Sequence, residues 1–471
     1  MSHIPFQSKR GFKGFLNVKD GLKKEGGDLK VNHHDGHFEI DSEGKLRKRL
    51  GNIIGDGLKY NSETDKIEAD FEKFSVNVRD FGATGDGETL DQNSIQSAID
   101  SVSNAGGGTV YFPAGTYLLE LLEGEDSAII CKSNVDLVGE GKGNTILKLS
   151  DDVTESGPID DFIHIIQIST SVSDLTVRDL QIDGNKDQRG NTLDLREDLL
   201  ESDGKNITLS NLIVKNSNGE GIDCDLPENL IINSCYVEKC LGNGIHVAED
   251  GHLGSQITNC QLSECSTVRN QGMINLRGSQ INVSNCRCVN KEGQEGRGIM
   301  ANAQGGNHNP ISITNCYFES TGSWSIFCLG QGVINITNCT GIRKDVEGGG
   351  SVFLDAERVN ISSCYFAGLG EGNMNRCVNF RKGSGTFIGC TLFLEHESGA
   401  EQCILVEDDC SDLIVSECRF VKGSVIFEDN VSRCVIQSSI INDGDLEISG
   451  VTNLAVNNFV DGQWRDGEHT A

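Results

Sequence analysis

The sequence predicts an all-β fold, a solenoid of stacked coils, and three observations carry this prediction. Short alternating segments recur through most of the 471 residues with a period in the twenties, which is typical of one solenoid coil. With 57 glycines, 5 prolines and 37% hydrophobic residues, the composition indicates an ordered chain with many turns. Cysteine recurs at the same register in eight of the segments, namely Cys235, Cys260, Cys286, Cys316, Cys339, Cys364, Cys390 and Cys418.

The repeated cysteines are expected to be core residues. Each copy, such as "ISITNCYF" at 311–318, reads as a short strand, a polar turn and a second strand. Cysteine is small and apolar enough to stack inside such coils as a ladder. No C-x₂-C pair is present, so we expect no zinc site, and we expect no other metal or cofactor. Reduced thiols in this number indicate folding in a cytosol.

Residues 75–120 predict a helix followed by two strands. Asp91 is a suitable N-cap, and apolar residues follow it at helical spacing from Ile95 to Val102. Three glycines at 106–108 end the helix, and "TVYFPAGTYLL" reads as two strands around a turn. Such a helix would cover the open N-terminal end of a solenoid, which otherwise exposes unpaired strand edge.

Residues 27–74 form a different region, in which short strands such as "LKV", "HFEI" and "KIEADF" alternate with glycine turns. No part of this region has enough apolar residues for a monomeric core. We therefore expect it to be stable only where several chains share their few apolar residues.

The net charge and the distribution of apolar residues exclude two classes of partner, nucleic acid and the membrane interior. The net charge of −30 leaves no basic footprint for nucleic acid. The sequence contains no run of about 20 apolar residues, so membrane insertion is not expected. The N-terminal "MSHIPFQSKRGFKGFLNVKDG" lacks the continuous apolar segment of a secretory signal, so none is expected.

One acidic stretch, "GEGIDCDLPE" at 219–228, stands out as a candidate site. Asp223 and Asp225 are two residues apart, and this spacing puts both on one face of a strand. Crowded carboxylates raise one another's pKa, which suits glycoside hydrolysis. The alternative is that both are solvated side chains on the outside of a strand.

The segment "VRDFGATGDGETLDQNSIQSAIDSVSNAGGGTVYFPAGTYLL" resembles the opening of pectate-lyase-superfamily proteins. This resemblance implies a right-handed parallel β-helix over residues 75–471, with the helix described above as its N-terminal cap. The superfamily includes polygalacturonase-like hydrolases, alginate C5-epimerases and many bacteriophage tail spikes. Residues 27–74 are similar to the triple β-spiral of viral fibre shafts, which implies a trimeric stalk. Residues 1–26 would then attach to the virion.

Residues 174–276 resemble the catalytic part of alginate C5-epimerases, through "LQIDGNKDQ", "EGIDCDL" and "GIHVAED". The resemblance places Asp223 on the family's catalytic aspartate, Glu249 on a later acidic position and Arg269 near a substrate-binding arginine. The sequence departs from the family's motif at three positions. Glu220, Asp225 and Leu226 stand where the family has tyrosine, histidine and glutamate. Epimerase or lyase chemistry in its usual form is therefore not expected, although His246, one coil from Asp225, could act as a base.

These resemblances together imply a homotrimeric phage tail spike or tail fibre, made in the host cytoplasm and carried on the virion tail. Its expected partners are a host cell-surface polysaccharide and, through the N-terminus, other tail proteins. We expect recognition of the polysaccharide and leave open its depolymerisation by hydrolase or lyase chemistry. The candidate catalytic residues are Asp223, Asp225, His246 and Glu249, with Arg269 as a substrate-binding residue. A cellular polysaccharide hydrolase, lyase or C5-epimerase and a non-catalytic adhesin are the alternatives.

Overall fold

A computed structural model gives the fold. Before residue 74 it describes the strands β1 to β8. Beyond that point it describes residues 74–151, 153, 162–186, 196–248, 254–266, 271–291, 294, 296–304, 310–320, 323–344, 350–369, 376–395, 402–449 and 453–469. The chain divides into two compact units, Met1–Ser75 and Val76–Ala471.

In the first unit, the described residues form four antiparallel strand pairs. These are β1 (His3–Gln7) with β2 (Lys13–Asn17), β3 (Leu22–Glu25) with β4 (Asp28–Val31), β5 (Phe38–Ile40) with β6 (Leu46–Lys48), and β7 (Leu58–Asn61) with β8 (Lys66–Ala69). The strands expected within 27–74 are therefore present. The triple β-spiral and the boundary between residues 26 and 27 stay predictions.

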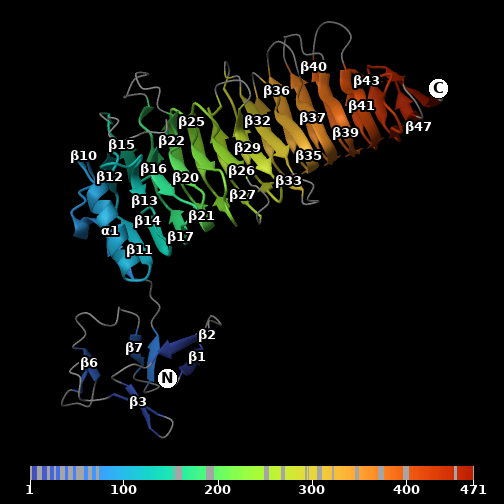
Figure 1. Ribbon diagram of the computed structural model, residues 1–471. Helices are drawn as coiled ribbons and strands as arrows, with labels where there is room; N and C mark the ends of the chain where they lie inside the picture. Colours follow the sequence, from blue (N-terminus) through green and yellow to red (C-terminus); the bar gives the residue numbers. More distant parts are fainter. Residues whose placement is uncertain are drawn as a thin grey trace. The chain divides into compact units, whose positions relative to one another are not determined.

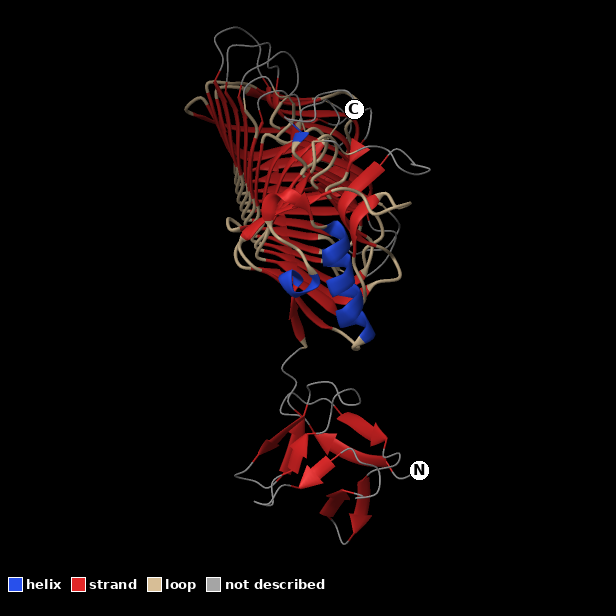
Figure 2. Ribbon diagram, turned by 90° about the vertical axis from the view of Figure 1, so that its left-hand side faces the viewer, coloured by secondary structure: helices blue, strands red, loops and turns tan. Residues whose placement is uncertain are grey.

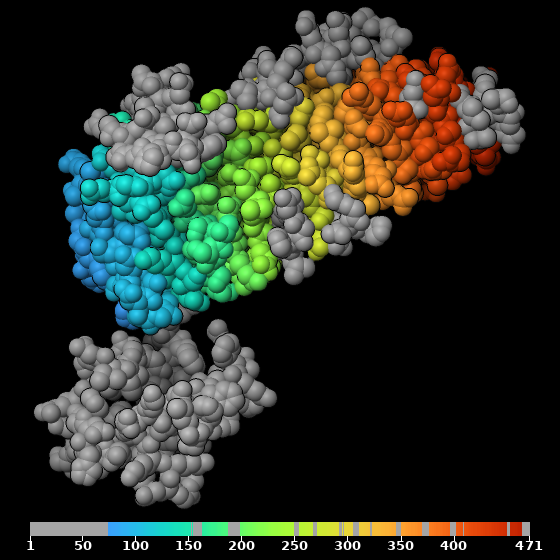
Figure 3. Space-filling model, in the orientation of Figure 1, coloured from blue at the N-terminus to red at the C-terminus, as the bar shows by residue number. Residues whose placement is uncertain are grey.

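The second unit is a right-handed parallel β-solenoid of about 11 turns, as the resemblance predicts. Nearly all strands pair in parallel with a strand one coil later, so three sheets run along the solenoid (Figure 1). Figure 3 shows its coils following one another in sequence order along the surface. Along most strands buried and partly exposed residues alternate, because successive side chains point into and out of the coil.

Sheet 1 carries the candidate site. It contains β13 (Ser127–Ile130), β16 (Phe162–Ile168), β19 (Arg196–Glu197), β20 (Leu200–Ser202), β23 (Ile222–Cys224), β26 (Ile245–Ala248), β29 (Gly272–Gly278), β32 (Arg297–Ala303), the first parts of β35 (Ile326–Thr337), β37 (Val352–Ser362), β39 (Arg376–Ile388) and β41 (Gln402–Ser416), then β43 (Ser424–Phe427) and β46 (Leu446–Ile448).

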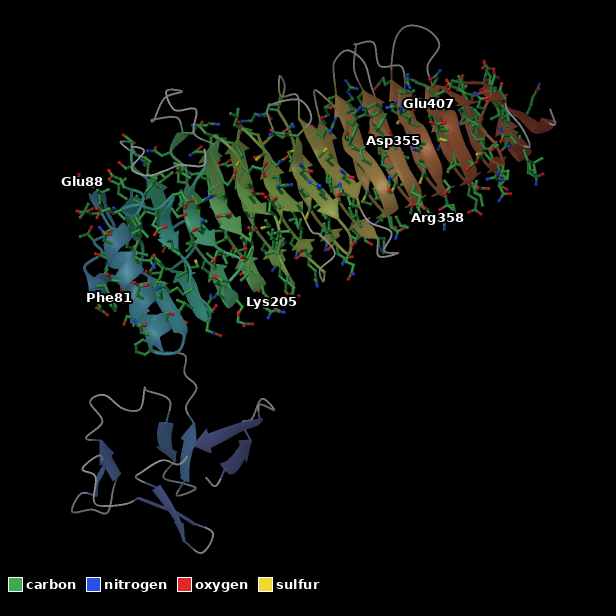
Figure 4. The ribbon with its side chains drawn as sticks, viewed as in Figure 1. Phe81, Glu88, Lys205, Asp355, Arg358 and Glu407 are labelled. Carbon is green, nitrogen blue, oxygen red and sulfur yellow. The ribbon has the colours of Figure 1, made fainter. Side chains whose placement is uncertain are left out.

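Sheet 2 contains β9 (Ser75–Asn77), β11 (Gly108–Phe112), β14 (Val135–Gly139), β17 (Ser173–Arg178), β21 (Lys205–Ser210), β24 (Ile231–Asn233), β27 (Gln256–Thr258), β30 (Asn282–Ser284), β33 (Ile311–Thr314), the last parts of β35, β37, β39 and β41, then β44 (Val435–Gln437) and β47 (Asn453–Val460). The long strands thus pass from one sheet to the next. Figure 4 shows this for β37, whose Asp355 and Arg358 lie on opposite sides of the solenoid.

Sheet 3 contains β10 (Asp86–Leu90), β12 (Gly115–Leu119), β15 (Thr145–Leu149), β18 (Gln181–Asp183), β22 (Ile213–Ser217), β25 (Tyr236–Cys240), β28 (Gln261–Ser263), β31 (Arg287–Val289), β34 (Tyr317–Ser320), β36 (Thr340–Lys344), β38 (Tyr365–Leu369), β40 (Thr391–Glu395), β42 (Arg419–Val421) and β45 (Ile440–Asn442). The final strand β48 (Gln463–His469) pairs with β47 in the antiparallel sense.

The expected helix is present as α1 (Gln92–Asn104), after a short 3₁₀ helix η1 (Val78–Phe81). Ile95, Ile99 and Val102 on one face of α1 are fully buried. Asp91 occupies the N-cap position, but its side chain makes no capping hydrogen bond. Its carboxylate instead accepts hydrogen bonds from the backbone N–H groups of Thr84 and Gly85, at 2.7 and 3.0 Å. Asp91 thus stabilises the loop before the helix, and the capping of the solenoid by α1 stays a prediction.

The cysteine ladder is confirmed. All 18 cysteines are free and buried. The residue before each of the eight ladder cysteines has a left-handed backbone, such as Asn315 and Asn338 with φ of 54° and 53°, and asparagine tolerates this conformation better than most residues. Asn338 Nδ2 also donates to Asn315 Oδ1 one coil earlier, at 2.7 Å. These one-residue turns repeat at the same place in successive coils and stack along the solenoid (Figure 2).

None of the helices in the described part of the chain has the length and apolar character needed to cross a bilayer.

Candidate active site

Consecutive strands of sheet 1 bring an acidic cluster together. Glu201 of β20 pairs in register with Asp223 of β23, and Asp223 pairs with His246 of β26. Both neighbours of Asp223 along β23, Ile222 and Cys224, are fully buried. Because side chains alternate along a strand, Asp223 and its partners on β20 and β26 point out of the coil.

His246 is the centre of this cluster. Its Nδ1 lies 2.7 Å from Asp223 Oδ1, a short hydrogen-bond distance. The same nitrogen lies 3.5 Å from Glu220 Oε2 and 3.8 Å from Asp225 Oδ1. The side chains of His246, Asp223 and Glu220 are 16–20% exposed, whereas that of Asp225 is 62% exposed. Asp225 is therefore at the solvent edge of the cluster.

A second line of residues holds Glu220 in place. Asn243 Nδ2 donates to Glu220 Oε1 at 2.5 Å, and Asn243 Oδ1 accepts from the Gly272 N–H at 3.0 Å. The backbone N–H of Glu220 donates to Asp198 Oδ1 at 3.1 Å. The carboxyl of Glu220 is thus fixed from one side, and its Oε2 is left facing His246.

A third group extends the site on the N-terminal side. His164 is 5% exposed, and its Nδ1 lies 3.0 Å from the carbonyl oxygen of Asp198. Its Nε2 lies 3.4 Å from Glu201 Oε2, which also accepts a hydrogen bond from Gln167 Nε2 at 2.9 Å. Four acidic residues therefore lie between the two histidines, namely Asp198, Glu201, Glu220 and Asp223.

Burial and crowding set the charge states. Burial, strengthened by the charges of Asp223 and Asp198, raises the pKa of Glu220 to about 8. Burial, with the charge of Asp223, likewise raises the pKa of Asp198 to about 6. Burial opposes the charge on His246, but the hydrogen bond to Asp223 and the surrounding carboxylates outweigh it and raise the His246 pKa to about 9. At neutral pH Glu220 therefore keeps its proton and His246 is a cation bound to the Asp223 carboxylate.

This arrangement offers a proton donor beside an ionised carboxylate, the pair that general acid catalysis at a glycosidic bond requires. The ligand atoms of Glu220, Asp223 and His246 also lie within 4.8 Å of one another, so the three residues have a spacing that could hold a cation.

Of the predicted site residues, the structure brings Asp223, Asp225 and His246 together. Glu249 and Arg269 lie outside the described residues, and their roles stay predictions. Sequence reasoning missed Glu220, Asp198, Glu201 and His164 as site residues. A signal for Glu220 was available, because "GEGID" and "GNGIH" align without a gap, which sets Glu220 beside Asn243 and Asp223 beside His246.

The raised pKa values predict that stability falls as the pH rises. The pKa of Glu220 is higher in the folded state than in the unfolded chain. The folded state therefore loses stability as the pH rises from about 4.5 to 8. The elevated pKa of His246 adds a loss of the same sign between about pH 6.5 and 9. Between pH 6 and pH 9, we expect the free energy of unfolding of the Glu220→Gln protein to fall by on the order of 2 kcal/mol less than that of the unsubstituted protein. Melting temperatures at the two pH values test this, and an equal fall in both proteins would contradict it.

The family comparison finds a match to the model described as rhamnogalacturonase A/epimerase, pectate lyase-like, over residues 75–287. Among curated proteins, the chain is similar to alginate lyase 7 of Azotobacter vinelandii, with 45% identity over 121 residues, which are 25% of this chain and 14% of that protein. It is also similar to mannuronan C5-epimerase AlgE1 of the same organism, with 33% identity over 225 residues, 45% of this chain and 15% of that protein. The chain thus spans a small part of the length of these relatives.

Solved structures share the fold at low identity. The AlgE6 epimerase A-module of Azotobacter vinelandii matches with a TM-score of 0.50 and 19% identity, covering 82% of this chain and 98% of that one. An N-terminal fragment of gene product 12 of bacteriophage Phi29 matches with a TM-score of 0.56 and 17% identity over 84% and 73% of the two chains. The tailspike protein of E. coli bacteriophage HK620, in complex with a hexasaccharide, matches with a TM-score of 0.54 and 13% identity, covering 81% of this chain and 80% of that one. Residues 75–287 of the chain therefore match a pectate-lyase-like family model, and the parallel β-solenoid is a fold that the HK620 tailspike and the epimerase A-module share.

Proposed function

We propose that the solenoid binds a polysaccharide along sheet 1 and hydrolyses it at the cluster of Glu220, Asp223 and His246. The observation that carries this proposal is a carboxyl that keeps its proton at neutral pH, with a pKa of about 8, next to a carboxylate paired with a cationic histidine. Two carboxyls whose environments separate their charge states in this way form an acid and a base or nucleophile.

In the proposed reaction, Glu220 donates its proton to the glycosidic oxygen as the bond from that oxygen to the anomeric carbon breaks. The Asp223 carboxylate attacks the anomeric carbon and forms a glycosyl ester. Glu220, now a carboxylate, then takes a proton from water, whose oxygen displaces Asp223 from the anomeric carbon. Throughout, His246 holds Asp223 in position by its hydrogen bond.

The short separation of the two carboxyls predicts retention of anomeric configuration. Oxygens of Glu220 and Asp223 lie within 4.8 Å of each other. This upper limit is below the ~5–5.5 Å of retaining glycosidases and well short of the ~6.5–9.5 Å that leaves room for a water in inverting ones. Proton NMR of the first products should show the substrate's anomer, and the opposite anomer would contradict the assignment of Asp223.

The same incubation distinguishes the reaction classes. Test substrates are alginate, because its lyases and epimerases are relatives in sequence, and isolated bacterial surface polysaccharide. New reducing ends without unsaturation support hydrolysis, whereas absorbance of a new C=C bond indicates a lyase. Inverted C5 stereochemistry without shortening indicates an epimerase. An absence of any change in both substrates would favour a non-catalytic adhesin.

We propose further that the chain is a homotrimeric tail spike or tail fibre carried on a phage virion. Its support is the likeness of the solenoid to two phage proteins, one of them a tailspike, together with the resemblance of residues 27–74 to fibre shafts. In this proposal α1 caps the solenoid, the preceding region forms the trimeric stalk and the N-terminus contacts other tail proteins. Native mass spectrometry should give three times 50.9 kDa, and a monomer would favour the alternative of a cellular polysaccharide enzyme.

A further inference from the structure

An aromatic cluster lies on the same sheet as the candidate active site. The register of sheet 1 continues from His246 to Asn275, then to Met300, and next to Phe327 and Phe353 on β35 and β37. Phe327 and Phe353 are partly exposed, whereas the residues on either side of them along the strands are buried. The aromatic cluster, defined as Trp324, Phe327 and Phe353, therefore faces outward in line with the site.

The cluster is held together by its own contacts. The Arg297 guanidinium lies 3.6 Å from the centre of the Phe327 ring, and the Phe353 ring stacks on Phe327 with centroids 4.6 Å apart. Arg297 is itself held by a hydrogen bond from its NH1 to Met300 Sδ at 2.9 Å. Trp324 stands outside this stack, because its ring is tilted by 53° to that of Phe353 at a centroid distance of 5.2 Å. Trp324 is partly exposed, so its indole can contact a partner.

Charged residues border the cluster on the C-terminal side. Arg376 NH1 lies 3.1 Å from Glu407 Oε1, and Arg381 lies between Asp355 and Glu407 at 3.8 and 3.9 Å. Figure 4 shows Asp355 and Glu407 on the same side of the solenoid. A small apolar surface with hydrogen-bonding groups at its border fits a sugar, which has apolar C–H faces and hydroxyl edges. Three rings are too few for a stable contact with a second chain, which buries about 1,000 Å² or more.

We propose that the aromatic cluster is a distal subsite for a polysaccharide, in which a pyranose ring packs its C–H face on Trp324. This rests on the proposed function, since the same glycan chain would continue to the cluster of Glu220, Asp223 and His246. Three strand steps separate His246 from Phe327, about 14 Å at ~4.8 Å per step. The bound chain therefore runs along the solenoid axis and spans several sugar residues, so long chains bind better than disaccharides.

The chain offers a direct probe, because Trp324 and Trp464 are its two tryptophans. Trp464→Phe leaves Trp324 as the sole indole, and Glu220→Gln in the same protein keeps the polysaccharide intact. Acrylamide quenching of Trp324 is then measured with alginate and with dextran, as acidic and neutral pyranose polymers, and with their disaccharides. We expect at least one polymer to shield Trp324, and its disaccharide to shield it much less at equal mass.

The affinity of the protein for the same polymers gives the second readout. Trp324→Ala and Phe353→Ala should each weaken this affinity about tenfold or more, because each removes one aromatic contact from the binding site. Tyr317→Ala is the matched control, since Tyr317 also lies under an arginine, with Arg287 5.0 Å from its ring, but on sheet 3. Equal melting temperatures establish that the variants fold.

The proposal is overturned if neither polymer shields Trp324, if a bound polymer leaves its quenching unchanged, or if Tyr317→Ala weakens the affinity as much as Trp324→Ala. Shielding that rises with protein concentration alone would assign the cluster to a contact between chains and would also overturn it. Shielding by a polymer that the unsubstituted protein does not cleave would keep the subsite and reject the hydrolase.

Discussion

Glu220→Gln is expected to reduce kcat for polysaccharide cleavage by about 10²–10⁴-fold, because the amide has no acidic proton to give to the leaving oxygen. The side chain keeps its size and its contact with Asn243, which lies 2.5 Å away, so binding should change little. The unsubstituted protein should lose activity above about pH 8, where Glu220 releases its proton. Residual activity in the variant should lack that alkaline limb.

Initial rates of reducing-end formation between pH 5 and 10 measure both effects. Glu228→Gln is the matched control, because Glu228 pairs with Lys205 at 2.6 Å on the neighbouring sheet, away from the cluster. A Glu220→Gln protein with full activity, or one that keeps the alkaline limb, would remove Glu220 from the role of proton donor.

The solenoid was predictable from sequence because buried residues of the same kind recur once per coil. Each ladder cysteine follows a left-handed turn residue and enters the core, so a change of coil length shows directly as a change in cysteine spacing. The same periodicity explains why Asp223 and His246 were found. They are 23 residues apart, one coil, and the parallel register sets them side by side.

The rest of the site depends on where each strand ends, which periodicity alone does not specify. Alternation predicted Asp223 and Asp225 on one face, but β23 ends at Cys224. The backbone N–H of Asp225 binds Asp203 Oδ1 at 2.8 Å, which turns the chain and leaves the Asp225 side chain exposed. Glu220 lies before the strand begins and reaches the cluster from the turn. Asp91 shows the same limit, since its partners Thr84 and Gly85 come from a loop rather than from the helix.

The proposed polysaccharide would meet a chain of net charge −30, and the site offsets part of that acidity. Among the cluster residues, Glu220 is neutral at pH 7 and His246 is positive, so the cationic imidazole balances the charge of Asp223. The exposed carboxyl of Asp225 and the neighbouring carboxyl of Glu201 add acidic groups beside it. A glycan with closely spaced negative charges would therefore be repelled at its reacting sugar more than a neutral one, and comparison of alginate with a neutral polymer bears on this.

Asp223→Asn should cause the largest loss, at least about 10³-fold in kcat/KM, because an amide neither attacks the anomeric carbon nor stabilises its positive charge. The substitution also changes the neighbouring charges in a defined direction. Asp223 raises the pKa values of both His246 and Glu220, so both should fall when its charge is removed. The alkaline limb of any residual activity should accordingly move to lower pH, which separates a loss of charge from a loss of structure.

Asp225→Asn is the matched control for that experiment, since the two aspartates are two residues apart and differ chiefly in burial. Asp225 is 62% exposed and lies 3.8 Å from His246, against 16% and 2.7 Å for Asp223. We expect Asp225→Asn to change kcat/KM by no more than about threefold, the scale of an exposed charge pair. Equal losses in the two variants would show that the cluster acts by its total charge. A fully active Asp223→Asn protein would instead remove Asp223 from the role of nucleophile.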